Sequence, residues 1–219
     1  MVKKAIKAFL GINPLPESAQ HLMLKVVGST ILLDMVWNLS TAFYVLFVID
    51  TVGIEQLSIL IAISFLLQAV LDYPSGVLGD WIGQRWILFI GYSLEALAFS
   101  IMIFTESFLS LLGVYIIRAV AFSQQSGEIE TWLDNNYKLV ANDVDPQRKI
   151  YKFFIGRRMT IGTIIPGVST VLGGIIATIT FRRAVFFFQF IGLTFMAVLF
   201  FLIIKDFPGI ERPKRSIRS

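Results

Sequence analysis

Ionisable side chains lie inside long apolar segments of this sequence, where they could bind a charged solute or a proton. Asp34 follows Lys25 by nine residues and Arg118 lies about ten residues inside an apolar run, so the helical rise places both near the middle of a bilayer. A charged group at that depth costs on the order of 3 kcal/mol on insertion scales, which favours a functional role. Asp34 could bind a cationic group or a proton, and Arg118 could bind an anion or keep Asp34 ionised. A static ion pair between the two is the structural alternative.

Polar residues extend these positions along helix faces. One face of the first apolar segment carries four of them at spacings of four, four and three, namely Thr30, Asp34, Asn38 and Thr41. The second segment carries a similar stripe of Ser64, Gln68, Asp72 and Ser75. Glu95, midway along the third segment, points toward Arg118 or serves as a second proton site. The predicted binding residues are Asp34, Asn38, Gln68, Glu95, Tyr115, Arg118 and Gln125.

The composition indicates an integral membrane protein and argues against an enzyme. Of 219 residues, 56% are hydrophobic, and the mean hydropathy is +0.75. Cysteine is absent and histidine occurs once, which excludes a thiolate or multi-histidine metal site. The sequence has no nucleophile–histidine pair, phosphate-binding loop or zinc spacing, so we expect no catalytic residues, metal or cofactor.

Six segments reach the length of about 20 apolar residues that a membrane-spanning helix needs. The spans are expected at 24–49, 54–79, 86–105, 107–133, 155–178 and 183–204, within a domain of residues 23–205. Residues 1–22 are expected to form a cytoplasmic tail, with an interfacial amphipathic helix as the alternative, and residues 206–219 a basic cytoplasmic tail. Sixteen of the 19 Lys and Arg residues fall on the side of the two tails, which predicts a multi-pass protein of the cell membrane with both termini in the cytoplasm.

A glycine-rich, charged turn separates the second and third spans. Between Ser75 and Arg85 the sequence reads SGVLGDWIGQR, with the pattern G-x-L-G-D-x-x-G-x-R. Glycines let helix ends approach closely, and the two charges can contact a neighbouring helix, so the turn could act as a latch at the membrane face.

This turn resembles the signature between the second and third helices of the major facilitator superfamily, although Trp81 and Gln84 stand where that family prefers Arg or Lys. The stretch RAVAFSQQSGEIETWLDNN resembles the fourth helix of the same family, whose terminal acid aligns with Asp134 or Asn135. The resemblance implies a latch made by Gly76, Asp80, Gly83, Arg85 and Asp134, in which Arg85 pairs with the terminal acid.

Members of that family generally have twelve helices in two halves, each half built from two inverted three-helix repeats. The chain resembles the N-terminal half, in which the first and fourth helices line the solute cavity. The resemblance implies an all-α membrane fold and secondary active transport of a small organic solute by alternating access, coupled to protons. Six helices need a second cavity wall, so a homodimer or a separate C-terminal half is the expected partner.

Two other functions compete with transport. A non-transporting membrane subunit, or a half-transporter fragment that needs a partner half, would have the same six spans. A membrane enzyme of the CDP-alcohol phosphotransferase type is disfavoured, because its D-G-x-x-A-R motif and Asp pair are missing. The net charge of +4 needs no nucleic-acid partner, because membrane sorting of basic residues accounts for it.

Overall fold

The computed structural model describes residues 2–205, and only the backbone of Val2, Ser75, Gly76, Val77 and Asp80. Helices account for most of this range, and no β-strand occurs within it. The helices are α1 (Val2–Phe9), α2 (Glu17–Trp37), α3 (Tyr44–Val52), α4 (Ile54–Ile82), α5 (Gln84–Met102), α6 (Phe108–Gln125), α7 (Glu128–Ala141), α8 (Lys149–Ile179) and α9 (Arg182–Ile203).

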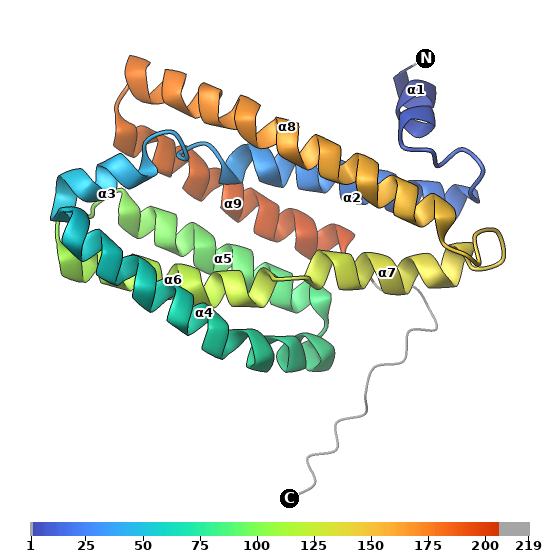
Figure 1. Cartoon of the computed structure of the whole chain (residues 1–219), viewed down its shortest axis with the longest axis horizontal. Helices are drawn as coiled ribbons and strands as arrows, with labels where there is room; N and C mark the ends of the chain where they lie inside the picture. The colour runs from blue at the N-terminus through green and yellow to red at the C-terminus, as the bar shows by residue number, and fades with distance from the viewer. Residues whose placement is uncertain (1, 206–219) are drawn as a thin grey trace, which may run out of the picture.

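Six helical segments in the described range are long and apolar enough to cross a membrane, which indicates a multi-pass membrane protein. Their long axes run along the bundle in Figure 1, where α8 lies on one side and α4 on the other, with α2, α9, α5 and α6 between them. The two ends of the bundle are named here after α1 and α3, which lie at opposite ends.

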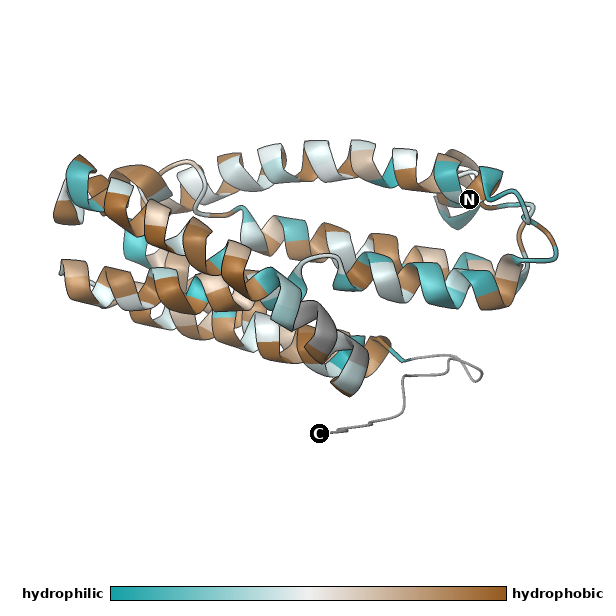
Figure 2. Cartoon of the chain, turned by 60° about the horizontal axis from the view of Figure 1, so that its bottom comes forward, coloured by the Kyte–Doolittle hydropathy of each residue, from teal (hydrophilic) through white to brown (hydrophobic). Residues whose placement is uncertain are grey.

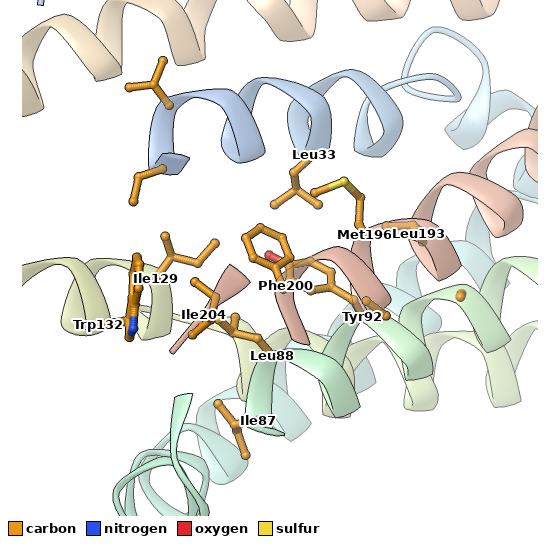
Figure 3. Close-up of a cluster of buried hydrophobic side chains, with 14 of the residues drawn as sticks. Leu33, Ile87, Leu88, Tyr92, Ile129, Trp132, Leu193, Met196, Phe200 and Ile204 are labelled. Atoms are coloured by element: carbon orange, nitrogen blue, oxygen red, sulfur yellow. The ribbon is translucent and has the colours of Figure 1, made fainter. Parts of the chain in front are cut away.

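The apolar core forms where α2, α5, α7 and α9 meet. Figure 3 shows Leu33 of α2, Ile129 of α7 and Met196 of α9 directed toward Tyr92 and Phe200. The rings of Tyr92 and Phe200 stack with their centroids 5.0 Å apart. α5 supplies one ring and α9 the other, and these two spans make the most extensive contact of any helix pair in the described residues.

The outer spans expose apolar side chains, in keeping with a lipid environment. Phe65 and Leu66 of α4 are 66% and 67% exposed, and Val171 of α8 is 63% exposed. Hydrophobic residues colour the flanks of the bundle in Figure 2, whereas hydrophilic ones gather toward the ends of the helices. Because exposure of this much apolar surface to water is unfavourable, these flanks are suited to contact with lipid or with another apolar surface.

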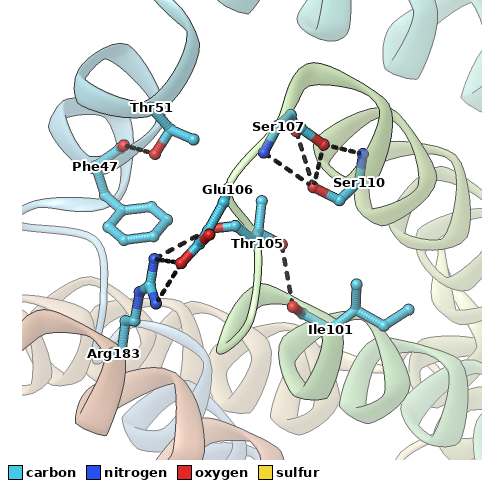
Figure 4. A network of polar contacts seen from close by, with 8 residues as sticks. All are labelled: Phe47, Thr51, Ile101, Thr105, Glu106, Ser107, Ser110 and Arg183. Carbon is cyan, nitrogen blue, oxygen red and sulfur yellow. Dashed lines mark hydrogen bonds and ion pairs between the residues drawn. The ribbon is translucent and has the colours of Figure 1, made fainter.

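A polar network closes the α3 end. The Arg183 guanidinium donates to the Thr105 carbonyl at 3.3 Å and to the Glu106 carboxylate at 3.3 Å. Ser107 and Ser110 form a reciprocal capping box at the start of α6. Figure 4 shows how these contacts bring the α5–α6 turn against the first turn of α9.

The predicted span limits need four corrections. The 24–49 helix is interrupted between Trp37 and Tyr44. The 107–133 helix is interrupted at Gly127, whose φ of +73° ends a right-handed helix, and its second part runs on to Ala141. The first span begins at Glu17 instead of residue 24, and the fifth span begins at Lys149 instead of residue 155.

Candidate functional site

The interruption between α2 and α3 divides the predicted polar face of the first span. Asn38 ends α2, and both its backbone N–H and its side-chain amide donate to the Asp34 carbonyl, the amide at 2.9 Å. Thr41 lies in the connection beyond the helix. Asp34 therefore lies in the last turn of a helix that ends inside the bundle, and Asn38 caps that helix instead of lining a cavity with it.

Side chains from α8 and α9 satisfy the carbonyl groups that the interruption frees. The Ser169 hydroxyl donates to the Met35 carbonyl. The Gln189 amide of α9 donates to the carbonyls of Val36 and Trp37 at 3.2 and 2.9 Å. These donors are needed because a bilayer offers no water to an unpaired backbone group.

Gln189 and Ser169 were missed as candidate residues in the sequence. Gln189 is fully buried, and its isolated amide within FFFQF was the available signal. In the same run Phe187 is half-exposed, whereas Phe186 is fully buried and packs against the rings of Phe43 and Phe47.

Asp34 lines the larger of two cavities in the middle of the bundle. This cavity, of about 660 Å³, lies between α2, α7 and α8 and also receives Gln125, Glu130, Arg158 and Gly162. Arg158 Nη2 and Glu130 Oε1 form an ion pair at 2.8 Å across its wall. Neither Arg158 nor Glu130 is among the binding residues predicted from the sequence. The cavity is therefore lined by two acidic side chains, Asp34 and Glu130, and one basic side chain, Arg158.

A smaller cavity of about 150 Å³ lies between α4, α5 and α6. It is lined by a polar set: Ser64, Gln68, Glu95, Tyr115 and Arg118. Arg118 Nε donates to Glu95 Oε1 at 2.8 Å, and the Glu95 side chain is 1% exposed. Glu95 Oε2 has no hydrogen-bond partner among the residues that the structure describes. A buried carboxylate oxygen beside a polar cavity is a position at which a proton or a polar ligand group can bind.

The guanidinium of Arg118 also lies against aromatic rings. Its Cζ is 5.1 Å from the centroid of the Tyr44 ring and 5.0 Å from that of Phe99. Such contacts stabilise a cation away from water. Arg118 is therefore held by α5 on one side and by the first turn of α3 on the other.

The static ion pair of Asp34 with Arg118, which the sequence offered as the structural alternative, does not form, because Arg118 pairs with Glu95. Of the two roles that the sequence left open for Glu95, the structure gives the contact with Arg118. Trp37 and Phe122 line both cavities and lie between the Asp34 cavity and the Arg118 cavity. Asp34 and Arg118 lie in adjoining cavities, because the side of α6 that carries Arg118 packs against α5.

Gln125 lies at the edge of the larger cavity. Its side chain packs on Gly91, where a Cβ atom would lie 2.7 Å from Gln125 Cγ. Its Nε2 is buried and has no acceptor within the described part of the chain. Gln125 therefore lines the cavity while its amide nitrogen is packed against α5.

The predicted latch is only partly formed. Gly83 adopts a φ of +89° between α4 and α5, as a tight turn requires. Arg85 donates to the Phe201 carbonyl at 2.5 Å and stacks over the Phe201 ring. For Gly76 and Asp80 the structure describes only the backbone. The prediction that Arg85 pairs with Asp134 is wrong, because the Arg85 guanidinium binds the Phe201 carbonyl of α9 instead.

Asp134 instead joins α7 to α8. Its carboxylate pairs with Lys138 at 2.7 Å and with Arg148. In the same connection, Asp145 accepts hydrogen bonds from the Tyr137 hydroxyl at 2.8 Å and the Tyr151 backbone N–H at 3.0 Å. Burial alone would raise the pKa of the Asp145 carboxyl, but these hydrogen bonds hold it below its ordinary value.

No group of three or more His, Cys, Asp or Glu side chains suited to a metal ion occurs in the described residues. No protein-family model, curated protein or solved structure matches the chain. The cavities and their charged side chains are therefore the basis for assigning a function.

Proposed function

We propose that the chain is one half of a secondary active transporter of the major facilitator type, which moves a small organic solute by alternating access coupled to protons. The observation that carries the proposal is the buried pair of Glu95 and Arg118, one aromatic layer away from the cavity that holds Asp34. Ionisable groups at this depth are costly and are retained chiefly along solute or ion pathways.

The proposed coupling follows from the charges. A proton on Glu95 removes the negative charge that Arg118 faces at 2.8 Å. Arg118 is then free to bind an anionic group of the solute in the polar cavity with Gln68 and Tyr115. Loss of the proton restores the pair and displaces the solute. Asp34 provides a second proton or cation position in the adjoining cavity.

Alternating access requires the barrier between the cavities to move. Trp37 and Phe122 separate them, and each lies at or near an interrupted span, α2–α3 and α6–α7. If residues 17–102 and 108–203 are the two inverted repeats of the half, each repeat begins with an interrupted span. Such interruptions supply the hinge positions that repeat-based transporters use.

The proposal includes a second wall for the cavities and a cytoplasmic location of both termini in the cell membrane. The exposed apolar sides of α4 and α8 are suited to a second copy of the chain or to a separate C-terminal half. The alternative is a non-transporting subunit or a half-transporter fragment, which would share this assembly.

Proteoliposomes that contain the full chain and a trapped pH-sensitive dye provide the test. A panel of small organic anions, cations and zwitterions is added outside, and we expect at least one to drive proton movement. Glu95→Gln and Asp34→Asn should abolish that movement, whereas Glu106→Gln, at the exposed α3 end, should leave it unchanged. Absence of solute-linked proton movement from a stable assembly would favour the non-transporting subunit.

A further inference from the structure

The N-terminal helix α1 runs across the direction of the spans instead of along it. In Figure 1 its axis crosses the long axis of the bundle, at the end where α2 begins and α7 ends. If the spans cross the bilayer, α1 therefore lies along the membrane surface. Interfacial helices adopt this position when one side is apolar and the other cationic.

Contacts with α8 hold α1 in place. The Arg157 guanidinium lies between the rings of Phe9 and Phe153, 4.9 and 5.0 Å from their centroids. Gly11 has a φ of +70°, and a Cβ atom there would lie 2.5 Å from the Phe153 ring. The following Ile12 is fully buried. The connection from α1 to α2 is thus packed against the bundle.

One side of α1 forms an apolar groove with α2. The groove has a volume of about 470 Å³ and is lined by apolar side chains that include Ile6, Phe9, Leu24 and Ile31, with Gly28 between them. Ile6 and Phe9 are 42% and 44% exposed. A Cβ atom at Gly28 would have no neighbour within 4 Å, so the floor of the groove is open.

The other side of α1 is cationic. Lys3, Lys4 and Lys7 surround a second hollow of about 430 Å³ together with Asn13 and Gln20. No acid lines this hollow, and the nearest acid in the sequence, Glu17, faces His21 at 3.8 Å. Helical geometry places the three lysines on the side of α1 away from Ala5 and Phe9.

We propose that α1 and the start of α2 form a binding site for an anionic phospholipid of the leaflet in which α1 lies. An acyl chain fills the groove beside Gly28, and the flexible lysine side chains reach the headgroup phosphate. The apolar lining suits an acyl chain, and the uncompensated positive charge distinguishes an anionic lipid from a zwitterionic one. This site is independent of the transport proposal, because it shares no charged residue with the central cavities.

Native mass spectrometry of the full chain tests the site, with phosphatidylglycerol and phosphatidylcholine of identical acyl chains as probes. The unmodified chain should retain phosphatidylglycerol preferentially, and the combined Lys3→Gln, Lys4→Gln and Lys7→Gln variant should bind it about tenfold more weakly. The double variant Lys149→Gln and Lys152→Gln, at an exposed helix start, should retain the preference. An equal loss of phosphatidylglycerol binding in both variants would mean that binding depends only on net charge, and the proposed site would be wrong.

The groove is tested separately from the charges. Gly28→Leu fills it and should weaken retention of both lipids, and Ile6→Gln on the exposed rim gives the same information if Gly28→Leu does not fold. Glycerol phosphate, which has the headgroup chemistry without acyl chains, should fail to compete. Competition by glycerol phosphate, or unchanged binding to both groove variants, would show that no acyl chain occupies the groove.

Discussion

The carboxylate of Glu95 and the guanidinium of Arg118 form an ion pair between α5 and α6, with 2.8 Å between Oε1 and Nε. Glu95 is almost fully buried, and its second oxygen has no partner in the described part of the chain. The pair can therefore hold the two helices together while leaving one oxygen to accept a proton. Removal of either partner leaves the other charge buried and uncompensated.

We expect Glu95→Gln and Arg118→Gln each to destabilise the protein by on the order of 3 to 5 kcal/mol, and the double variant to cost less than the sum. Unfolding in mixed detergent micelles, followed by tryptophan fluorescence, measures the stability of the three variants and of the unmodified protein. The pair of Arg183 with Glu106, in which Glu106 is 76% exposed, is the matched control and should couple by no more than about 1 kcal/mol. Additive losses for Glu95 and Arg118 would contradict a mutually stabilising pair.

Gly173 lets α8 approach the connection between α2 and α3. A Cβ atom at this position would overlap the carbonyl group of Leu39, so Gly173→Ala must displace the connection and should lower the thermal midpoint. Gly167→Ala, on the same helix, meets no atom within 4 Å and should have little effect. Thermal unfolding in detergent compares the two, and equal midpoints would mean that the approach of Gly173 to Leu39 is not close.

The side-chain amide of Gln189 should contribute to the stability of the fold, because it is a buried hydrogen-bond donor. Gln189→Leu keeps the volume similar but removes the side-chain donor from the carbonyls of Val36 and Trp37, and only Val36 keeps a backbone donor, the Leu39 N–H at 3.4 Å. This loss should cost about 1 to 3 kcal/mol. Thr194→Val on the same helix removes only an exposed bond to the Phe190 carbonyl and is the control. Denaturant unfolding of both variants distinguishes a required donor from a replaceable one.

The spans could be predicted from the sequence because length and apolar composition are local properties. The interruption between Trp37 and Tyr44 could not, because NLSTAF contains no glycine or proline to signal it. Its freed carbonyls find donors in Ser169 and Gln189, more than 130 residues away. Only the packing of α8 and α9 on α2 makes this interruption stable.

The residues of the candidate site could be named from the sequence, but their pairing could not. Asp34 and Glu95 lie at similar depths, and either could face Arg118. The choice depends on which side of α6 packs against α5, and this is decided by the whole bundle. For the same reason the sequence does not indicate a site role for Arg158, although its long side chain reaches the wall of the Asp34 cavity.

The contacts of Arg85 and Asp134 predict that the two residues are energetically independent. Arg85 binds the Phe201 carbonyl, whereas Asp134 binds Lys138 and Arg148. A double-mutant cycle with Arg85→Gln and Asp134→Asn should therefore give additive losses of stability. The parallel cycle of Arg148→Gln with Asp134→Asn should give a clear coupling. Coupling between Arg85 and Asp134 would instead restore the latch that the resemblance implies.

Asp145 should make the stability of the α7–α8 connection depend on pH. Its pKa is lowered in the folded protein, so its ionised form stabilises the fold at neutral pH, and this contribution is lost as the pH falls below about 4 and through the lowered pKa. We expect Asp145→Asn to lower the thermal midpoint at pH 7, and the difference from the unmodified protein to shrink as the pH falls toward 3. Asp143→Asn, an exposed position in the same connection, should differ little from the unmodified protein throughout. A deficit of Asp145→Asn that is constant with pH would mean that its hydrogen bonds do not favour the ionised carboxylate.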